Sequence, residues 1–304
     1  MLFCDKHNVF TRQITFLSVN SLQQNSFETF YQINELKIAC QRLQNQATKV
    51  IALHGWQDNS NSFVPLMSEL SHFDWYAIDF PGHGKSDWRN NQAHYYFIDY
   101  VDDVFRLKQQ IAANEQVIII GHSMGAMVAN LFAACFPEHV KAVICIEGIG
   151  CVTTNENEVT TQLKNAILNR TENKPNRIFS SFEQIVKARI AVSDLNKQHA
   201  SLLMERNAEL SENGYKLCTD PKLKHHSGFR FTPNQCIEMC KNIVSPMLVI
   251  KAINGYSLVN QGLEKYSKYF CKLTVNEVSG GHHCHLEYPK EVAKLVNVYV
   301  KGML

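Results

Sequence analysis

Several features that define whole classes of protein are missing from this sequence of 304 residues. No apolar run approaches the roughly 18 residues that a membrane-spanning helix needs. No basic run indicates a nucleic-acid surface, because 30 Lys and Arg are balanced by 28 Asp and Glu, for a net charge of +2. The first residues also lack the basic-then-apolar order of a secretory leader. We therefore expect a soluble cytoplasmic protein with no membrane span and no nucleic-acid partner. Nothing in the sequence indicates its oligomeric state.

The ten cysteines show no metal or disulfide spacing. None forms a CxxC pair, and Cys236 and Cys240 stand four apart in an expected helix. Free thiols are the default in a chain without an export signal. The sequence therefore calls for no metal and no organic cofactor.

Short apolar runs alternate with amphipathic segments along most of the chain. This rhythm is typical of a parallel sheet covered by helices on both faces. The sequence thus predicts an α/β fold with a mostly parallel central sheet. The expected strands are 49–55, 74–84, 116–123, 141–148, 245–255 and 272–282.

The rhythm stops between about Cys151 and residue 235. This stretch is polar and has no buried-strand pattern, and its segments 160–170, 181–192 and 196–210 have helical periodicity. We expect a helical cap over 151–235, inserted into a core of 1–150 and 236–304. Its apolar residues could line a pocket or form the cap's own core; they are Phe179, Phe182, Leu202, Leu203 and Met204.

A candidate nucleophile stands in IIIGHSMGAM, which contains the pattern G-x-S-x-G around Ser123. The pattern alone is weak, but here an apolar strand precedes the serine and a small-residue helix follows it. Such a sharp strand-to-helix turn needs glycines and presents the hydroxyl at the edge of the sheet. The alternative is a glycine-rich turn in which Ser123 only caps the helix.

Three histidines in SGGHHCHLEYP follow the last expected strand. A loop there could carry an imidazole to Ser123, and His282, directly after the two glycines, is our candidate general base. A metal site made by His282, His283, Cys284 and His285 is the rival interpretation. It is disfavoured because adjacent ligands converge poorly on one tetrahedral ion. His285 is expected to pack or cap near Glu287.

Acyl-transfer chemistry also needs two backbone N–H groups directed at the developing oxyanion. The amide of Met124, next to the nucleophile, is one candidate. Trp56 follows His54 and Gly55 in the loop after an early strand, and its amide is the other. The alternative is a simple tight turn in which the indole of Trp56 covers the core.

Four motifs in order, LHGWQDNSNSF, YAIDFPGHGKS, IIIGHSMGAMVA and GGHHCHLEYP, resemble the α/β-hydrolase superfamily, and in particular the serine hydrolase-like proteins. The resemblance covers 49–150 and 240–300. It implies an α/β-hydrolase fold, and the insertion resembles that family's cap, with Asp-Pro-Lys-Leu at 220–223.

The resemblance also raises a question about the third catalytic residue. In the common pattern an Asp falls where this chain has Gly255, and no Asp or Glu lies between Pro246 and Glu264. In some branches the acid instead follows the strand after the nucleophile helix, where Glu147 stands. Glu147 is therefore our candidate acid, with a surface or salt-bridged carboxylate as the alternative. Asp79 competes, although a turn-stabilising role suits it better, and Asn254 could orient a histidine weakly.

Together these residues predict a serine hydrolase that cleaves a carboxylic ester or thioester of a small to medium acyl substrate. Ser123 would attack, His282 would take the proton, and Glu147 would orient His282. Position 123 is Ser rather than Asp, which disfavours dehalogenase and epoxide hydrolase chemistry. Two alternatives stay open: a C–C bond hydrolase acting on a diketone, and a non-catalytic binding protein on the same fold.

Overall fold

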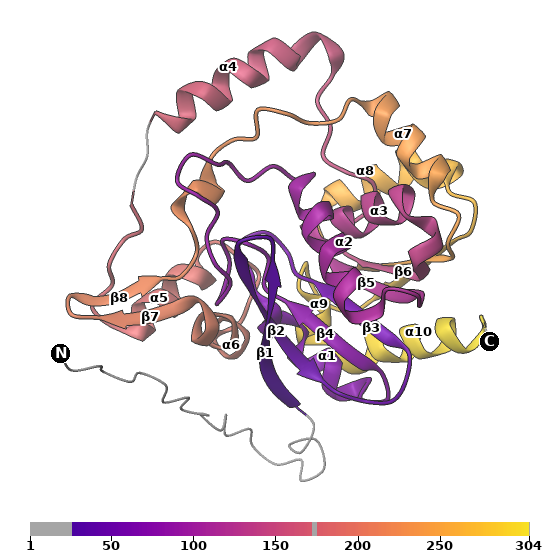
Figure 1. Ribbon diagram of the computed structural model, residues 1–304, viewed down its shortest axis with the longest axis horizontal. Helices are drawn as coiled ribbons and strands as arrows, with labels where there is room; N and C mark the ends of the chain where they lie inside the picture. Colours follow the sequence, from indigo (N-terminus) through magenta and orange to yellow (C-terminus); the bar gives the residue numbers. More distant parts are fainter. Residues whose placement is uncertain (1–25, 172–174, 304) are drawn as a thin grey trace, which may run out of the picture.

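The computed structural model describes residues 26–171 and 175–303, so the expectation about the N-terminal leader lies outside the described residues. An eight-stranded sheet runs through the molecule in the order β1-β2-β4-β3-β5-β6-β9-β10 (Figure 1). All pairs from β4 to β10 are parallel, whereas β1, β2 and β4 pair antiparallel. The strands are β1 Ser26–Ile33, β2 Leu36–Leu43, β3 Lys49–Leu53, β4 Asp74–Ile78, β5 Val117–His122, β6 Val140–Ile146, β9 Met247–Ala252 and β10 Leu273–Val278.

Two apolar cores lie on the two faces of this sheet. On one face the sheet packs against α2, α3, α7 and α8, and on the other against α1, α9 and α10. Strands β3, β4 and β5 are buried along almost their whole length, which explains their continuous apolar sequence. These helices are α1 Val64–Glu69, α2 Asp99–Ala112, α3 Met124–Cys135, α7 Pro233–Asn242, α8 Ser257–Tyr266, α9 Cys284–Glu287 and α10 Pro289–Lys301. The fold is the predicted α/β-hydrolase fold.

The sequence analysis missed the first two strands. β1 carries mostly exposed side chains, because it lies at the edge of the sheet, and its alternation of apolar and polar residues is weak. A two-residue loop joins β1 to β2, with Asn34 at a positive φ of 54°. Such a loop is typical of a tight hairpin.

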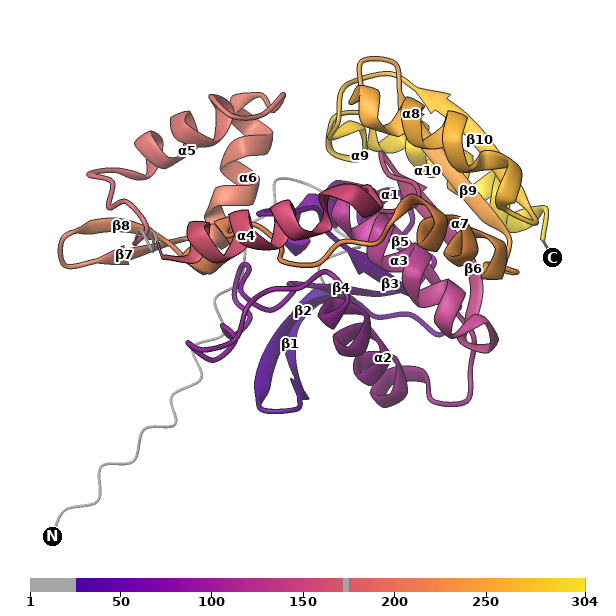
Figure 2. The same ribbon diagram turned by 90° about the horizontal axis from the view of Figure 1, so that it is seen from above.

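The segment between β6 and β9 contains helices that stand away from the sheet, together with a β-hairpin that the sequence analysis did not predict. We call residues 175–220 of this segment the lid. Figures 1 and 2 show α5, α6 and the hairpin grouped together beside the sheet, with α4 reaching across toward them. The elements are α4 Val159–Arg170, α5 Phe182–Ile190, α6 Lys197–Asn207, β7 Ala208–Ser211 and β8 Gly214–Leu217.

The helix expected over 196–210 therefore ends at Asn207, and its last residues form β7 instead. The lid has its own apolar core, which also includes Leu286 of α9. The five apolar residues left open above all belong to this core or pack against it. They stabilise the lid and do not line the pocket described below.

No helix among residues 26–171 and 175–303 is long and apolar enough to cross a membrane. All nine cysteines in these ranges are free thiols.

Candidate active site

Ser123 stands in the sharp turn between β5 and α3. Its backbone has φ 52° and ψ −117°, a conformation that side-chain-bearing residues rarely adopt. The turn is so tight that a Cβ on Gly121 would overlap the backbone of Ala126, and one on Gly125 would overlap that of Leu53. Both glycines of the motif are therefore required by packing. Strain of this kind at a reactive side chain is typical of a functional site.

The ring of His282 lies against Ser123. Its Nε2 is 3.0 Å from Ser123 Oγ, which is hydrogen-bond distance. His282 follows β10 and the two glycines, as expected from the sequence, and it is buried. The phenol ring of Tyr256 stacks on the imidazole, with ring centroids 3.9 Å apart and planes 13° apart. This stacking restricts rotation of the imidazole without using either of its nitrogens.

Glu147 reaches the other side of the same imidazole. It is the first residue after β6, has a positive φ of 53°, and is only 2% exposed. Its Oε2 lies 3.2 Å from His282 Nδ1. The carboxylate also accepts backbone N–H bonds from Ala252 at 2.7 Å and from Tyr256 at 3.2 Å. These two amides hold the carboxylate in place beside the ring.

The two rival acids lie elsewhere. Asp79 is fully buried, and its carboxylate is 2.7 Å from Arg206 Nε of the lid. It also accepts N–H bonds from Ser60 at 2.7 Å and Lys85 at 2.8 Å, so it holds a turn and anchors the lid. Asn254 is exposed, and within the described residues only its backbone makes a hydrogen bond, to Gly280 O.

The two amides expected at an oxyanion hole come from different elements. Met124 is the first residue of α3, where no helical carbonyl can accept its N–H. Trp56 lies in the loop after β3, and within the described part of the chain its N–H has no backbone acceptor. The indole of Trp56 does not cover the core, which corrects the alternative given above. It is 53% exposed and donates to Leu223 O at 3.1 Å.

The rings of His282, His283 and His285 all lie around that of His122, with centroids 4.8, 5.1 and 4.2 Å from it, and His283 is described with the second cluster below. His285 is fully buried and packs against Phe63, with ring centroids 5.3 Å apart, and burial lowers its pKa to about 3. His285 therefore packs in the core, which is the first of the two roles expected from the sequence. His225 is half-buried and His226 is exposed.

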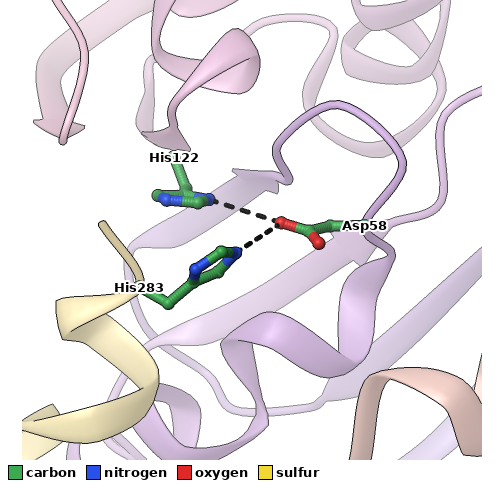
Figure 3. A group of neighbouring side chains, drawn as sticks. All are labelled: Asp58, His122 and His283. Atoms are coloured by element: carbon green, nitrogen blue, oxygen red, sulfur yellow. Dashed lines mark ion pairs between the residues drawn. The ribbon is translucent and has the colours of Figure 1, made fainter. Parts of the chain in front are cut away.

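A second buried cluster, which the sequence did not indicate, lies beside the first (Figure 3). Asp58 Oδ2 is 3.3 Å from His283 Nε2 and 3.7 Å from His122 Nδ1. Two histidines and a carboxylate are donors that divalent cations prefer. Here, however, the Arg189 guanidinium lies 2.6 Å from Asp58 Oδ1 and 3.5 Å from His283 Nε2. A side chain already supplies positive charge, which favours an ion-pair network over a metal site.

A small pocket opens beside Ser123. Besides Ser123, Glu147 and His282, it is lined mainly by apolar side chains. These are Met127, Ile149, Tyr256, Leu258 and Val259. The lining provides apolar contact area next to the serine and only a few polar groups, as is usual for sites that bind small molecules.

The chain is similar to several known proteins. A serine hydrolase-like protein of Danio rerio is 29% identical over 266 residues, covering 83% of this chain and 81% of that protein. A pimeloyl-[acyl-carrier protein] methyl ester esterase of Shewanella woodyi is 33% identical over 113 residues, 37% of this chain and 41% of the esterase. The crystal structure of a hypothetical protein from Pseudomonas aeruginosa PAO1 superposes with a TM-score of 0.83 at 28% identity, covering 90% of this chain and 97% of the other.

These relatives support a hydrolase, and the resemblance to serine hydrolase-like proteins stated from the sequence is confirmed. The family model described as alpha/beta hydrolase fold matches residues 49–289. That span includes all three residues that meet at the candidate site, Ser123, Glu147 and His282. The chain therefore belongs to the α/β-hydrolase fold family.

Proposed function

We propose that this protein is a serine hydrolase that cleaves a carboxylic ester or thioester of a small to medium acyl substrate. The single observation that carries the proposal is the position of His282 between two partners. One ring nitrogen lies 3.0 Å from the Ser123 hydroxyl and the other lies 3.2 Å from the Glu147 carboxylate. A nucleophile, a base and an orienting acid within hydrogen-bond reach are what covalent acyl transfer requires.

In the proposed reaction, Ser123 Oγ attacks the carbonyl carbon and its proton passes to His282 Nε2. The carbonyl oxygen gains negative charge and is stabilised by the N–H groups of Met124 and Trp56. His282 then donates the proton to the leaving alcohol or thiol, and the acyl group remains on Ser123. Water then attacks the acyl carbon and gives a proton to His282, and His282 passes this proton to Ser123 Oγ as the bond between the acyl group and the serine breaks, which releases the acid.

Glu147 has a supporting role in this scheme. Its carboxylate accepts the Nδ1–H of His282, which leaves Nε2 unprotonated and directed at Ser123. Because the amides of Ala252 and Tyr256 bind the carboxylate as well, it can stabilise the imidazolium without moving. The proposed acid thus follows β6 rather than β9.

The apolar pocket lining supports an acyl group as the bound part of the substrate. The similarity to a methyl ester esterase, although limited to 37% of this chain, favours an ester. A C–C bond hydrolase would use the same three residues, so substrate comparison has to separate the two reactions. A series of p-nitrophenyl esters of increasing acyl length, an acyl thioester and a vinylogous diketone would be assayed side by side.

Labelling with a fluorophosphonate probe tests the proposal itself. The wild-type protein is expected to form one covalent adduct, which peptide mass spectrometry finds on Ser123. Ser123→Ala is the control and should remain unmodified. A wild-type protein that takes up no probe would reject the proposal and favour a non-catalytic binding protein.

A further inference from the structure

Two charged residues of the lid enter the buried cluster beside the candidate active site. Arg189, near the end of α5, places its Nη2 2.6 Å from Asp58 Oδ1. Asp194, a few residues further on, places its Oδ1 2.6 Å from His283 Nδ1. Asp58 and His283 belong to the core, in the loop after β3 and directly before α9. Each lid residue thus pairs with an oppositely charged or chargeable core residue.

His283 has the geometry of an imidazolium. Its Nδ1 faces Asp194 at 2.6 Å and its Nε2 faces Asp58 at 3.3 Å, so both ring nitrogens have a carboxylate partner (Figure 3 shows the second pair). The other titratable or charged groups near it among the described residues are His122, His282, His285, Arg189 and, on α6, His199. Burial opposes the charge on His283, but the two carboxylates raise its pKa to about 9.

The cluster is connected to the proposed base by short covalent and hydrogen-bonded links. His283 is the neighbour of His282 in the chain, and the backbone amide of His283 also faces Asp194, at 3.3 Å. His122 Nε2 donates to the carbonyl oxygen of His282 at 2.8 Å, and His122 precedes the nucleophile. The cluster therefore binds both the carbonyl oxygen and the amide nitrogen of the peptide bond between His282 and His283. A shift of this segment would change the distance from His282 to Ser123.

We propose that Arg189 and Asp194 are positioning residues, through which the docked lid fixes the backbone that carries His282. This inference rests on the proposed hydrolase function. The lid donates one cation and one anion to a site where the core supplies Asp58 and His283. When the lid moves away, Asp58 and His283 each lose a partner of opposite charge, and the base segment loses two of its anchors. Docking of the lid on the core therefore also fixes the position of His282.

A comparison of two carboxylate-to-amide substitutions tests this. Asp194→Asn removes a carboxylate that joins the lid to the core beside His282. Glu28→Gln is the matched control, because Glu28 joins the core to Arg206 of the lid at a distance from the base. The side chains of both carboxylates are 28% exposed. Asp194→Glu keeps the charge and serves as the conservative variant.

Two quantities are measured for each protein: the pKa of His283 by NMR titration, assigned with His283→Gln, and the rate of fluorophosphonate labelling of Ser123 against pH. We expect Asp194→Asn to lower the His283 pKa by about one unit, since an opposite charge at this range shifts a pKa by about 1–3 units. Its labelling rate should fall about tenfold, because a distant change that misplaces a catalytic group costs up to about 10²-fold, and it should decline at a lower pH than in the wild type. Glu28→Gln should match the wild type in both quantities, and Asp194→Glu should recover most of the rate.

Labelling profiles of Asp194→Asn and Glu28→Gln that superimpose on the wild type would overturn the inference and leave the proposed hydrolase function intact. Equal losses in both variants would also overturn it, because they would indicate only a loosened lid. A wild-type protein that is not labelled at all would instead reject the proposed function, and the inference with it. Thermal unfolding of each variant shows whether a loss of rate reflects a loss of fold.

Discussion

The carboxylate of Glu147 occupies the space that a side chain on Gly255 would need. A Cβ built on Gly255 would overlap both carboxylate oxygens of Glu147. Gly255 N–H bonds to Ala252 O, and the neighbouring Tyr256 N–H bonds to Glu147. The loop after β9, where the common family pattern has an Asp, therefore serves here as the binding site for a carboxylate that comes from β6. Glycine at 255 and glutamate at 147 are complementary.

This complementarity predicts that Gly255→Ala lowers activity although residue 255 carries no functional group. The added methyl group has to displace the Glu147 carboxylate, at a cost of about 1–3 kcal/mol, and the imidazole then loses its partner. Ester hydrolysis and thermal unfolding would be measured together. A fully active Gly255→Ala protein would show that Glu147 need not stand where it does.

The same relationship predicts a rescue. Glu147→Ala removes the acid and frees the space, and adding Gly255→Asp puts a carboxylate back beside His282 from the other loop. We expect the double variant to be about tenfold or more faster than Glu147→Ala alone, because the imidazole regains an orienting acid. Gly255→Asp in the presence of Glu147 is the control and should be impaired, since two carboxylates then compete for one space.

Ser123→Ala should abolish most of the activity and leave the fold intact. Loss of the nucleophile lowers turnover by about 10³- to 10⁶-fold. The substitution should change stability little, because alanine keeps the Cβ of serine and the strain of the turn lies in the backbone. Initial rates with a p-nitrophenyl ester and an unfolding curve give both results. Turnover within tenfold of the wild type would mean that another residue attacks the ester.

The two buried acids should respond differently to neutralisation. Glu147→Gln is expected to cut turnover by on the order of 10⁴-fold with little change in stability, as for a triad acid. Asp79→Asn leaves Arg206 without its closest buried partner, and breaking such a pair costs about 3–5 kcal/mol of stability. Its activity below the unfolding temperature should stay near that of the wild type. Equal kinetic losses in two folded variants would contradict the choice of Glu147.

Stability should depend on pH through His283. Its pKa is raised from the ordinary 6.5 to about 9 in the folded protein. The folded state therefore binds this proton more tightly than the unfolded state does. The resulting stabilisation is fully present below pH 6.5 and is lost as the pH rises through about 9.

The difference corresponds to on the order of 3 kcal/mol. Unfolding by urea at pH 6.5 and pH 9.5 would measure it, with His283→Gln as the control in which this part of the pH dependence disappears. If the wild type and His283→Gln lose the same stability between these pH values, His283 is not the group responsible.

The sequence was sufficient for the parts of the molecule that obey local rules. Continuous apolar runs predicted the buried parallel strands, because such strands have no exposed face. The edge strand β1 escaped notice for the opposite reason: most of its side chains face solvent. Residues 208–210 of the lid hairpin were predicted as the end of a helix, and its second strand was not predicted, although Asn213 in the turn and Gly214 directly after it are residues typical of hairpins.

The candidate site divides in the same way. Ser123 and Glu147 directly follow β5 and β6, and His282 lies in the loop after β10. Parallel strands end at one edge of a sheet, so the motifs predicted that these residues meet. Arg189 and Asp58 are 131 residues apart, and neither belongs to a motif that the sequence analysis could use. Their contact depends on how the lid packs against the core. No periodicity or spacing in the sequence encodes that packing.

Detection of the acyl-enzyme is the most direct test of the proposed reaction at Ser123. The protein would be mixed with a p-nitrophenyl ester, quenched in acid within the first turnovers, and digested for mass spectrometry. We predict that the peptide containing Ser123 gains the mass of one acyl group, and that this adduct is absent from Ser123→Ala and accumulates far more slowly in Glu147→Gln. An ester that is hydrolysed at the same rate by wild type and Ser123→Ala, with no acyl group on any peptide, would contradict the account.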